Sequence, residues 1–227
     1  MKDIKKIVAL TGAGISAESG ITTFRDAGGL WENYDVMEVA SLDGWHKNPQ
    51  LMLRFYNERR KQLAEVEPNE AHYILAELEK DFDVTIVTQN VDNLHERGGS
   101  TKIIHLHGEL TKARSSNDPG QVVDIGYEPI AWGEKAPDGS QLRPHVVWFQ
   151  EAVPLIARAA ELISEADIVL IIGTSLNVYP AAGLVGYAHR KASIYLIDPN
   201  DVEYPGRKIT VIRDKATAGM KKIRELL

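Results

Sequence analysis

Cysteine is absent from this sequence of 227 residues. Its absence excludes disulfide bonds, zinc sites built from thiolates and a cysteine nucleophile. Seven histidines are present, but none of their spacings indicates a metal site. His105 and His107 are two residues apart, and we assign them no third ligand. We therefore expect no metal ion, and we expect the protein to fold without one.

Long apolar runs and an excess of basic residues are also missing. No apolar stretch approaches the roughly 20 residues that span a bilayer, and Met1–Ile4 leads directly into the first expected strand, leaving no room for a signal peptide. The net charge of -6 argues against non-specific binding to nucleic acid. We expect a cytoplasmic protein without membrane or nucleic-acid partners.

The pattern of apolar residues predicts an α/β fold. Residues 69–80 and 154–164 carry apolar residues at spacings of three and four, as helices do. They lie between short β-branched runs, which we interpret as strands: Val84–Val87, Ile103–Leu106, Ile168–Ile172, Ile194–Ile197 and Ile209–Ile212. This alternation is typical of a doubly wound parallel sheet.

A further strand is expected between Ile4 and Gly12, and it ends in Gly12-Ala13-Gly14 before an expected helix start. Two glycines there allow the backbone to approach a pyrophosphate, and the helix would offer free N–H groups. Close packing of strand and helix is the alternative reason for such a turn. No acidic residue follows a second strand at the spacing of an ordinary dehydrogenase. Instead a glycine-rich loop, residues 20–31, is expected to cover the ligand.

Polar residues follow most of the expected strands. They are Thr11-Gly12, Thr88-Gln89-Asn90, His107-Gly108, Gly173-Thr174-Ser175 and Asp198-Pro199-Asn200. Each one alone is explained as a loop or helix cap. Because the carboxyl ends of parallel strands meet at one edge of a sheet, together they predict a site for a large polar ligand.

Two stretches do not fit the sheet. Residues 42–66 read as a helical insert, with Pro49 near a helix start, and residues 111–144 suggest a small lobe that contains a hairpin. We expect them to form a small domain, about 42–67 and 111–144, inserted into a large domain of about 1–41, 68–110 and 145–227.

Six short motifs occur in one order along the chain: Gly12-Ala-Gly14-Ile-Ser16, Phe24-Arg25, Thr88-Gln89-Asn90-Val91-Asp92, Leu106-His107-Gly108, Arg143-Pro-His-Val-Val147-Trp-Phe149 and Gly173-Thr174-Ser175. In order and spacing the chain resembles the sirtuins, the NAD-dependent protein-lysine deacylases. The resemblance covers nearly the whole chain. It implies a Rossmann-like large domain, NAD as the cofactor and proteins that carry acyl-lysine as substrates, with nicotinamide and O-acyl-ADP-ribose as products.

The resemblance also implies roles for individual residues. His107 matches the base, although a histidine alone is more often part of a core, and Asn90 and Asp92 match the groups that hold the nicotinamide end. The implied cofactor-binding set is Gly12, Ala13, Gly14, Ser16, Phe24, Arg25, Gln89, Asn90, Val91, Asp92, Gly173, Thr174, Ser175, Asp198 and Asn200.

Substrate binding is expected at two places. The peptide would add as a strand between residues 147–151 and 177–179, which contribute Val147, Phe149, Asn177, Val178 and Tyr179. Tyr56 and Arg59 lie three apart, on one face of an expected helix. The Tyr-x-x-Arg pair resembles that of sirtuins that remove succinyl and malonyl groups, while a solvated basic stripe with Arg54, Arg60 and Lys61 is the alternative.

The chain departs from the family at two points. Thr22 and Thr23 replace the usual residues of the cofactor loop, and the four zinc-binding cysteines of the small domain are missing from residues 113–142. We expect packing around Val122, Tyr127 and Trp132 to replace the zinc. A catalytically idle NAD-binding module and an ADP-ribosyltransferase or NAD hydrolase are the alternative functions.

Overall fold

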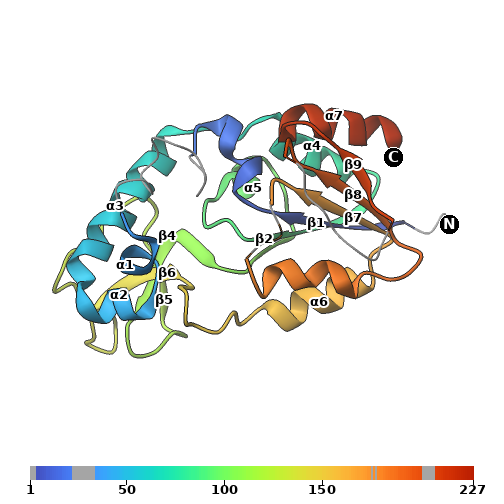
Figure 1. Cartoon of the computed structure of the whole chain (residues 1–227). Coiled ribbons are helices and arrows are strands. Elements are labelled where there is room, and N and C mark those ends of the chain that lie inside the picture. Colours follow the sequence, from blue (N-terminus) through green and yellow to red (C-terminus); the bar gives the residue numbers. More distant parts are fainter. Residues whose placement is uncertain (1–3, 22–33, 175, 177, 201–207) are drawn as a thin grey trace.

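The computed structural model describes residues 4–21, 34–174, 176, 178–200 and 208–227. Its main sheet is parallel, with the strand order β3-β2-β1-β7-β8-β9 (Figure 1). The strands are β1 Lys6–Thr11, β2 Asp83–Thr88, β3 Ile103–His105, β7 Ile168–Ile172, β8 Ser193–Ile197 and β9 Thr210–Ile212. This order confirms the predicted doubly wound α/β fold.

Helices cover both faces of this sheet. Helices α4 (Glu70–Leu78) and α7 (Ala216–Leu226) pack on one face, and α6 (Ile156–Ser164) with the 3-10 helix η4 (Ala181–Tyr187) packs on the other (Figure 1). Strand β1 shows why both faces are apolar: Ile7 and Ala9 point into one core while Val8 and Leu10 point into the other. Among the described residues, no helix combines the length and apolar content needed to cross a membrane.

The expected α-helix after Gly14 is not there. Two single-turn 3-10 helices take its place, η1 Ala13–Ile15 and η2 Ala17–Ser19. They end at Gly20, whose positive φ of 96° turns the chain out of the helical direction. Such short turns carry little of the dipole that we expected at a helix start.

A second sheet, of three antiparallel strands, lies to one side of the first. It consists of β4 Gly108–Ser115, β5 Val122–Asp124 and β6 Leu142–Val146, in the order β5-β4-β6. Helices α1 Val36–Val39, α2 Leu42–Lys47 and α3 Pro49–Glu65 pack against it, and the short helix α5 Leu94–Arg97 follows β2 (Figure 1). Helix α3 begins as expected, with Pro49 in its first turn and the Asn48 side chain accepting from Leu51 N. The predicted hairpin and helical insert are thus confirmed, while the domain boundaries stay a prediction.

The residues expected to replace the zinc do not fill the core of this lobe. Val122 and Tyr127 are each 40% exposed, and Trp132 is 55% exposed. The buried apolar residues of the lobe are Ala113, Ile130, Ala136 and Leu142, which join the cluster around α3. The large side chains near the turns of this lobe lie at its surface, and residues of smaller volume pack against α3 instead.

A buried hydroxyl ties the loops of the lobe together. Ser115 is 1% exposed, and its Oγ donates to Asp138 Oδ2 at 2.6 Å and lies 2.8 Å from Ser140 Oγ. The same oxygen accepts from the backbone N–H groups of Asn117 and Asp118. The hydrogen bond from Ser115, together with those from Ser140, lowers the pKa of Asp138. The end of β4 is thereby joined to the turn that precedes β6.

We predict that Ser115→Ala destabilises the protein by about 1–3 kcal/mol, because it removes a buried hydroxyl that takes part in four hydrogen bonds. For a chain of this size the melting temperature should fall by several degrees. Thermal unfolding followed by circular dichroism measures the change, with the exposed Ser193→Ala as control. Equal melting temperatures for the two variants would contradict the role given to Ser115.

Two buried histidines lie beside strand β1. The rings of His72 and His95 are 4.9 Å apart, His72 Nδ1 accepts from Asn69 N, and His95 Nε2 is 3.0 Å from Thr11 Oγ1. Burial lowers the pKa of His72 to about 4 and holds the pKa of His95 well below its usual value. Both rings are therefore neutral at pH 7.

These two histidines should make stability depend on pH. In the unfolded chain they take up protons near pH 6.5, but the folded protein resists protonation of His72 until about pH 4. Stability is therefore complete above about pH 6.5 and falls on acidification by about 1.4 kcal/mol per pH unit for each proton withheld. The free energy of unfolding, measured with urea between pH 7.5 and 4.5, should fall less on acidification in His72→Gln than in the exposed control His46→Gln. Identical slopes would contradict this account.

Candidate active site

A cavity of about 990 Å³ opens at the carboxyl edge of the main sheet. This volume lies at the upper end of the range for ligand sites, about 300–1,000 Å³. Strand β1 pairs with β2 on one side and with β7 on the other, and the direction of strand order changes between β1 and β7. The cavity therefore lies at the topological switch point of the sheet.

Most of the predicted site residues line this one cavity. Those predicted for the cofactor are Gly12, Ala13, Gly14, Ser16, Gln89, Asn90, Val91, Asp92, Gly173, Thr174, Asp198 and Asn200, together with the predicted base His107. Those predicted for the substrate are Tyr56, Arg59, Val147, Phe149, Val178 and Tyr179. Phe24, Arg25, Ser175 and Asn177 lie outside the described residues.

The turns after β1 and β7 touch each other at the floor of the cavity. Gly14 N donates to Gly173 O at 2.9 Å. A Cβ atom on Gly14 would stand 2.6 Å from the Cα of Gly173, which itself has a φ of +61°. The close packing of two turns thus requires glycine at both positions. Gln89 Nε2 donates to Thr174 Oγ1 and ties the turn after β2 to the same place.

The turn after β2 carries a buried carboxylate into the cavity. Asp92 is 5% exposed, and it accepts from Ser16 Oγ at 3.0 Å and from Leu94 N at 3.1 Å. Burial raises the pKa of Asp92, and these two hydrogen bonds oppose the rise. The Asn90 side chain donates to both Gly12 O and Ser16 Oγ, so Asn90 and Asp92 are fixed by one network.

His107 is held with one ring nitrogen turned away from the cavity. Its Nδ1 lies 3.0 Å from the carbonyl oxygen of Gln89. Because a carbonyl only accepts, Nδ1 carries the hydrogen and Nε2 keeps its lone pair. Burial lowers the pKa of His107, and the bond to Gln89 opposes this. A neutral imidazole with a free lone pair is suited to accept a proton.

A tyrosine and an arginine from α3 also line the cavity. Tyr56 is 1% exposed, and its hydroxyl oxygen accepts from Trp148 Nε1 at 3.0 Å. Burial raises the pKa of Tyr56 to about 12, so the hydroxyl keeps its hydrogen. The Arg59 guanidinium lies 5.7 Å from the Phe55 ring centroid and 5.9 Å from that of Tyr56. The cavity wall formed by Tyr56 and Arg59 therefore combines a hydroxyl donor with a cation.

The basic residues of α3 do not form the single solvated stripe that was the alternative interpretation. Arg54 and Lys61 are exposed, but Arg60 is fully buried and donates to Leu110 O and Asn57 Oδ1. Arg59 is half-buried at the cavity wall, where burial lowers the pKa of its guanidinium while Tyr56 and Asp92 oppose this. The four cations thus have different environments, and they do not share one solvated face of the helix.

Charged groups pack against Trp148 and hold it in place. The Arg143 guanidinium stacks 3.3 Å from the Trp148 ring centroid. Glu151 accepts from Arg143 and Arg114 and also from Trp148 N. The rigid indole in turn directs the Tyr56 hydroxyl.

Comparison with known proteins decides the family. A profile described as "Sir2 family" matches residues 12–180. The chain belongs to the Sir2 family. Two similar relatives carry the name "NAD-dependent protein deacylase". One, from Bacteroides thetaiotaomicron, is 56% identical over 99% of this chain and 98% of its own length. The other, from Helicobacter pylori, is 60% identical over 86% of this chain and 85% of its own length.

Solved structures of Sir2 homologues have the same fold. A complex of a Sir2 homologue with NAD is 37% identical, has a TM-score of 0.88, and matches 99% of this chain and 91% of its own. A complex of Sir2 with a p53 peptide and NAD+ is 27% identical, has a TM-score of 0.82, and matches 99% of this chain and 94% of its own. The fold predicted from the Sir2-like motifs is thereby confirmed.

Several residues of this Sir2-family cavity were missed. Trp148 was quoted only as part of a motif, and its bond to Tyr56 spans 92 residues, so no local pattern signals it. Lys215 and Ala216 also line the cavity. They follow β9, and the rule that ligands bind at strand ends would have found them had it been applied to the last strand.

The expected strand addition is limited at several residues, since Val147 N donates to His107 O at 2.9 Å and Trp148 N donates to Glu151 Oε2 at 2.8 Å. Phe149 N donates to Ala40 O at 2.9 Å, and Phe149 O accepts from Leu42 N at 3.2 Å. These main-chain groups are therefore not available to a peptide. Pairing with the rest of residues 147–151 stays a prediction.

Proposed function

We propose that this Sir2-family protein, an NAD-dependent protein-lysine deacylase, removes succinyl, malonyl and acetyl groups from lysine. One observation carries the proposal: a single cavity is lined both by His107, Asn90 and Asp92 and by the pair of Tyr56 and Arg59. The proposed products are free lysine, nicotinamide and an O-acyl-ADP-ribose, with water consumed. Proteins that carry acyl-lysine are the proposed partners, and a cytoplasmic location stays a prediction.

The polar strand ends fit a dinucleotide in character and extent. Backbone groups of the glycine turns and the Thr174 hydroxyl would hold phosphate and ribose, while Asp198 and Asn200 would hold the adenosine. Asn90 and Asp92 would hold the nicotinamide end, whose carboxamide needs a donor and an acceptor. NAD supplies the ribose carbon that receives the acyl oxygen and the nicotinamide that leaves.

His107 would act on a ribose hydroxyl. Its Nε2 lone pair, preserved by the Nδ1 bond to Gln89, would accept the hydroxyl proton as this oxygen attacks the acyl carbon. The lowered pKa keeps the imidazole neutral at pH 7 and therefore ready to accept. Val146, Val147 and Trp148 line the same cavity and would limit the access of water.

Tyr56 and Arg59 would recognise the acyl group. The Tyr56 oxygen already accepts from Trp148, so its own hydrogen is left to donate to a succinyl or malonyl carboxylate. Arg59 would supply the opposite charge, and its planar fork matches two carboxylate oxygens. Apolar residues Val36 and Ala40 line the same cavity and would accommodate the methylene part of the chain.

Product analysis tests the proposal directly. The protein is incubated with NAD and a succinyl-lysine peptide, and the products are followed by mass spectrometry. We expect deacylated peptide, nicotinamide and O-succinyl-ADP-ribose in equal amounts. Release of nicotinamide with free ADP-ribose and an unchanged peptide would instead identify an NAD hydrolase.

We predict that His107→Ala lowers the deacylation rate by roughly 10²–10⁴-fold, the usual contribution of a general base. NAD affinity should stay within severalfold, because the base contributes little to ground-state binding. Steady-state kinetics and calorimetric NAD titration separate the two effects, with His46→Ala as control. Near-normal turnover would remove His107 from the mechanism.

The variant Arg59→Met should show whether Arg59 recognises the acyl group or supports the fold. A hydrogen bond to a charged group contributes about 1.5–3 kcal/mol, so kcat/KM for succinyl-lysine should fall roughly 10- to 150-fold. Deacetylation should fall much less, because acetyl-lysine has no carboxylate. The matched control is Arg54→Met, an exposed arginine on the same helix. Equal losses on both substrates would assign Arg59 to the fold or to NAD binding.

A further inference from the structure

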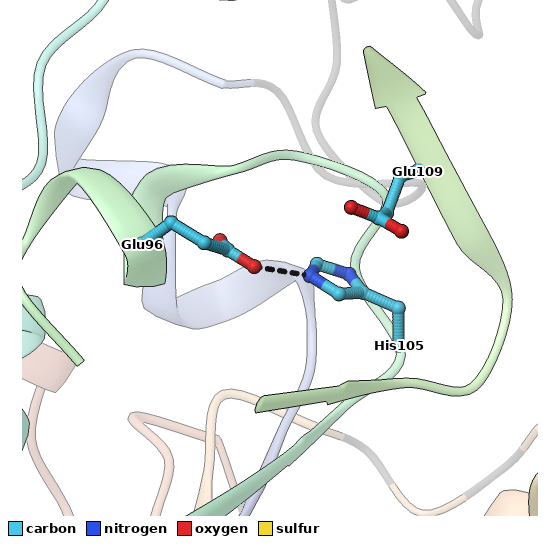
Figure 2. Close-up of side chains that lie close together, drawn as sticks. All are labelled: Glu96, His105 and Glu109. Carbon is cyan, nitrogen blue, oxygen red and sulfur yellow. Dashed lines mark hydrogen bonds and ion pairs between the residues drawn. The ribbon is translucent and has the colours of Figure 1, made fainter. Parts of the chain in front are cut away.

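Three side chains that commonly bind metals meet outside the cavity. Glu96 comes from α5, His105 from β3 and Glu109 from β4, and one ligand atom of each lies within 4.8 Å of those of the other two. Figure 2 shows the Glu96 carboxylate at one edge of the His105 ring, with the Glu109 carboxylate extending toward the same ring. Within the described ranges this is the one such group of three, and none of its members lines the cavity.

The imidazole of His105 is oriented as in a metal ligand. Its side chain is only 8% exposed. Nδ1 lies 3.1 Å from Asn90 O, a carbonyl that only accepts, so this nitrogen carries the hydrogen. Nε2 is thus the ligand atom, and it lies 2.7 Å from Glu96 Oε1. Histidines that bind metals are held in this way, with the second nitrogen donating to a carbonyl or carboxylate.

The ring nitrogens bond to two oxygens, Asn90 O and Glu96 Oε1. A proton lies between Nε2 and the Glu96 carboxylate, and a metal ion that binds there would replace it. One imidazole nitrogen with two carboxylates is a donor set that suits zinc and similar divalent transition metals, whereas Mg²⁺ and Ca²⁺ favour oxygen alone. We propose that Glu96, His105 and Glu109 form a binding site for a zinc-like divalent cation.

Lys112 competes for this site. Its Nζ lies 2.8 Å from Glu109 Oε2, so a protein cation already neutralises one of the three ligands. This ammonium competes with a metal ion for the negative charge of Glu109. The site therefore differs from a zinc that holds a domain together, since β3 is already paired with β2 and β4 with β6.

Binding of Co²⁺ and Zn²⁺ to the metal-free protein tests the proposal. Cobalt is followed by its visible absorption and zinc by calorimetry, both with NAD at saturation so that His107 is shielded. We expect one equivalent to bind, and we expect Glu96→Gln and Glu109→Gln each to weaken binding at least tenfold. Glu225→Gln, an exposed acid on α7, is the matched control. Circular dichroism confirms that each variant is folded.

A second variant provides a test in the opposite direction. Lys112→Met frees Glu109 and should tighten metal binding severalfold, whereas Lys102→Met removes the same charge from a pair with Asp83 and should not. The proposal fails if metal affinity is unchanged in Glu96→Gln and Glu109→Gln. It also fails if His107→Ala, rather than these variants, abolishes binding, because the metal would then occupy the cavity.

Discussion

The buried carboxylate of Asp92 constrains the arrangement of the groups around it. An ionised group that is removed from water must be compensated by hydrogen bonds, or it becomes protonated. Here Ser16 comes from the turn after β1, and Leu94 N comes from the start of α5. The same Ser16 hydroxyl accepts from Asn90. Satisfying one carboxylate thus fixes the turns after two neighbouring strands.

Two histidines extend this constraint to the turn after β3. His107 bonds to the carbonyl of Gln89, and His105 bonds to the carbonyl of the next residue, Asn90. Alternate residues of one strand end thus hold consecutive carbonyls of its neighbour, although only His107 lines the cavity. The proposed base and the proposed metal ligand are in this way positioned by the same stretch of backbone. A metal on His105 leaves its bond to Asn90 in place, so the two sites are compatible.

The sequence predicts this site well where local rules apply. The residues that follow the apolar strands were expected to meet at one edge, and Gly12, Asn90, Gly173 and Asp198 do so because the strands of the main sheet are parallel. Contacts between distant segments were not predictable. The bond between Tyr56 and Trp148, the group of Glu96, His105 and Glu109, and the exposure of Trp132 depend on how the lobe packs. The helix expected after Gly14 failed because Gly20 ends the turn early.

The central claim is that one cavity holds the nucleotide and the acyl group together. A crystal structure of the protein with NAD and a succinyl-lysine peptide tests it most directly. The account predicts that the nicotinamide end lies against Asn90 and Asp92 and that the succinyl carboxylate lies within hydrogen-bonding distance of Tyr56 and Arg59. A succinyl group that points away from α3, or NAD bound outside the edge formed by β1 and β7, would contradict it.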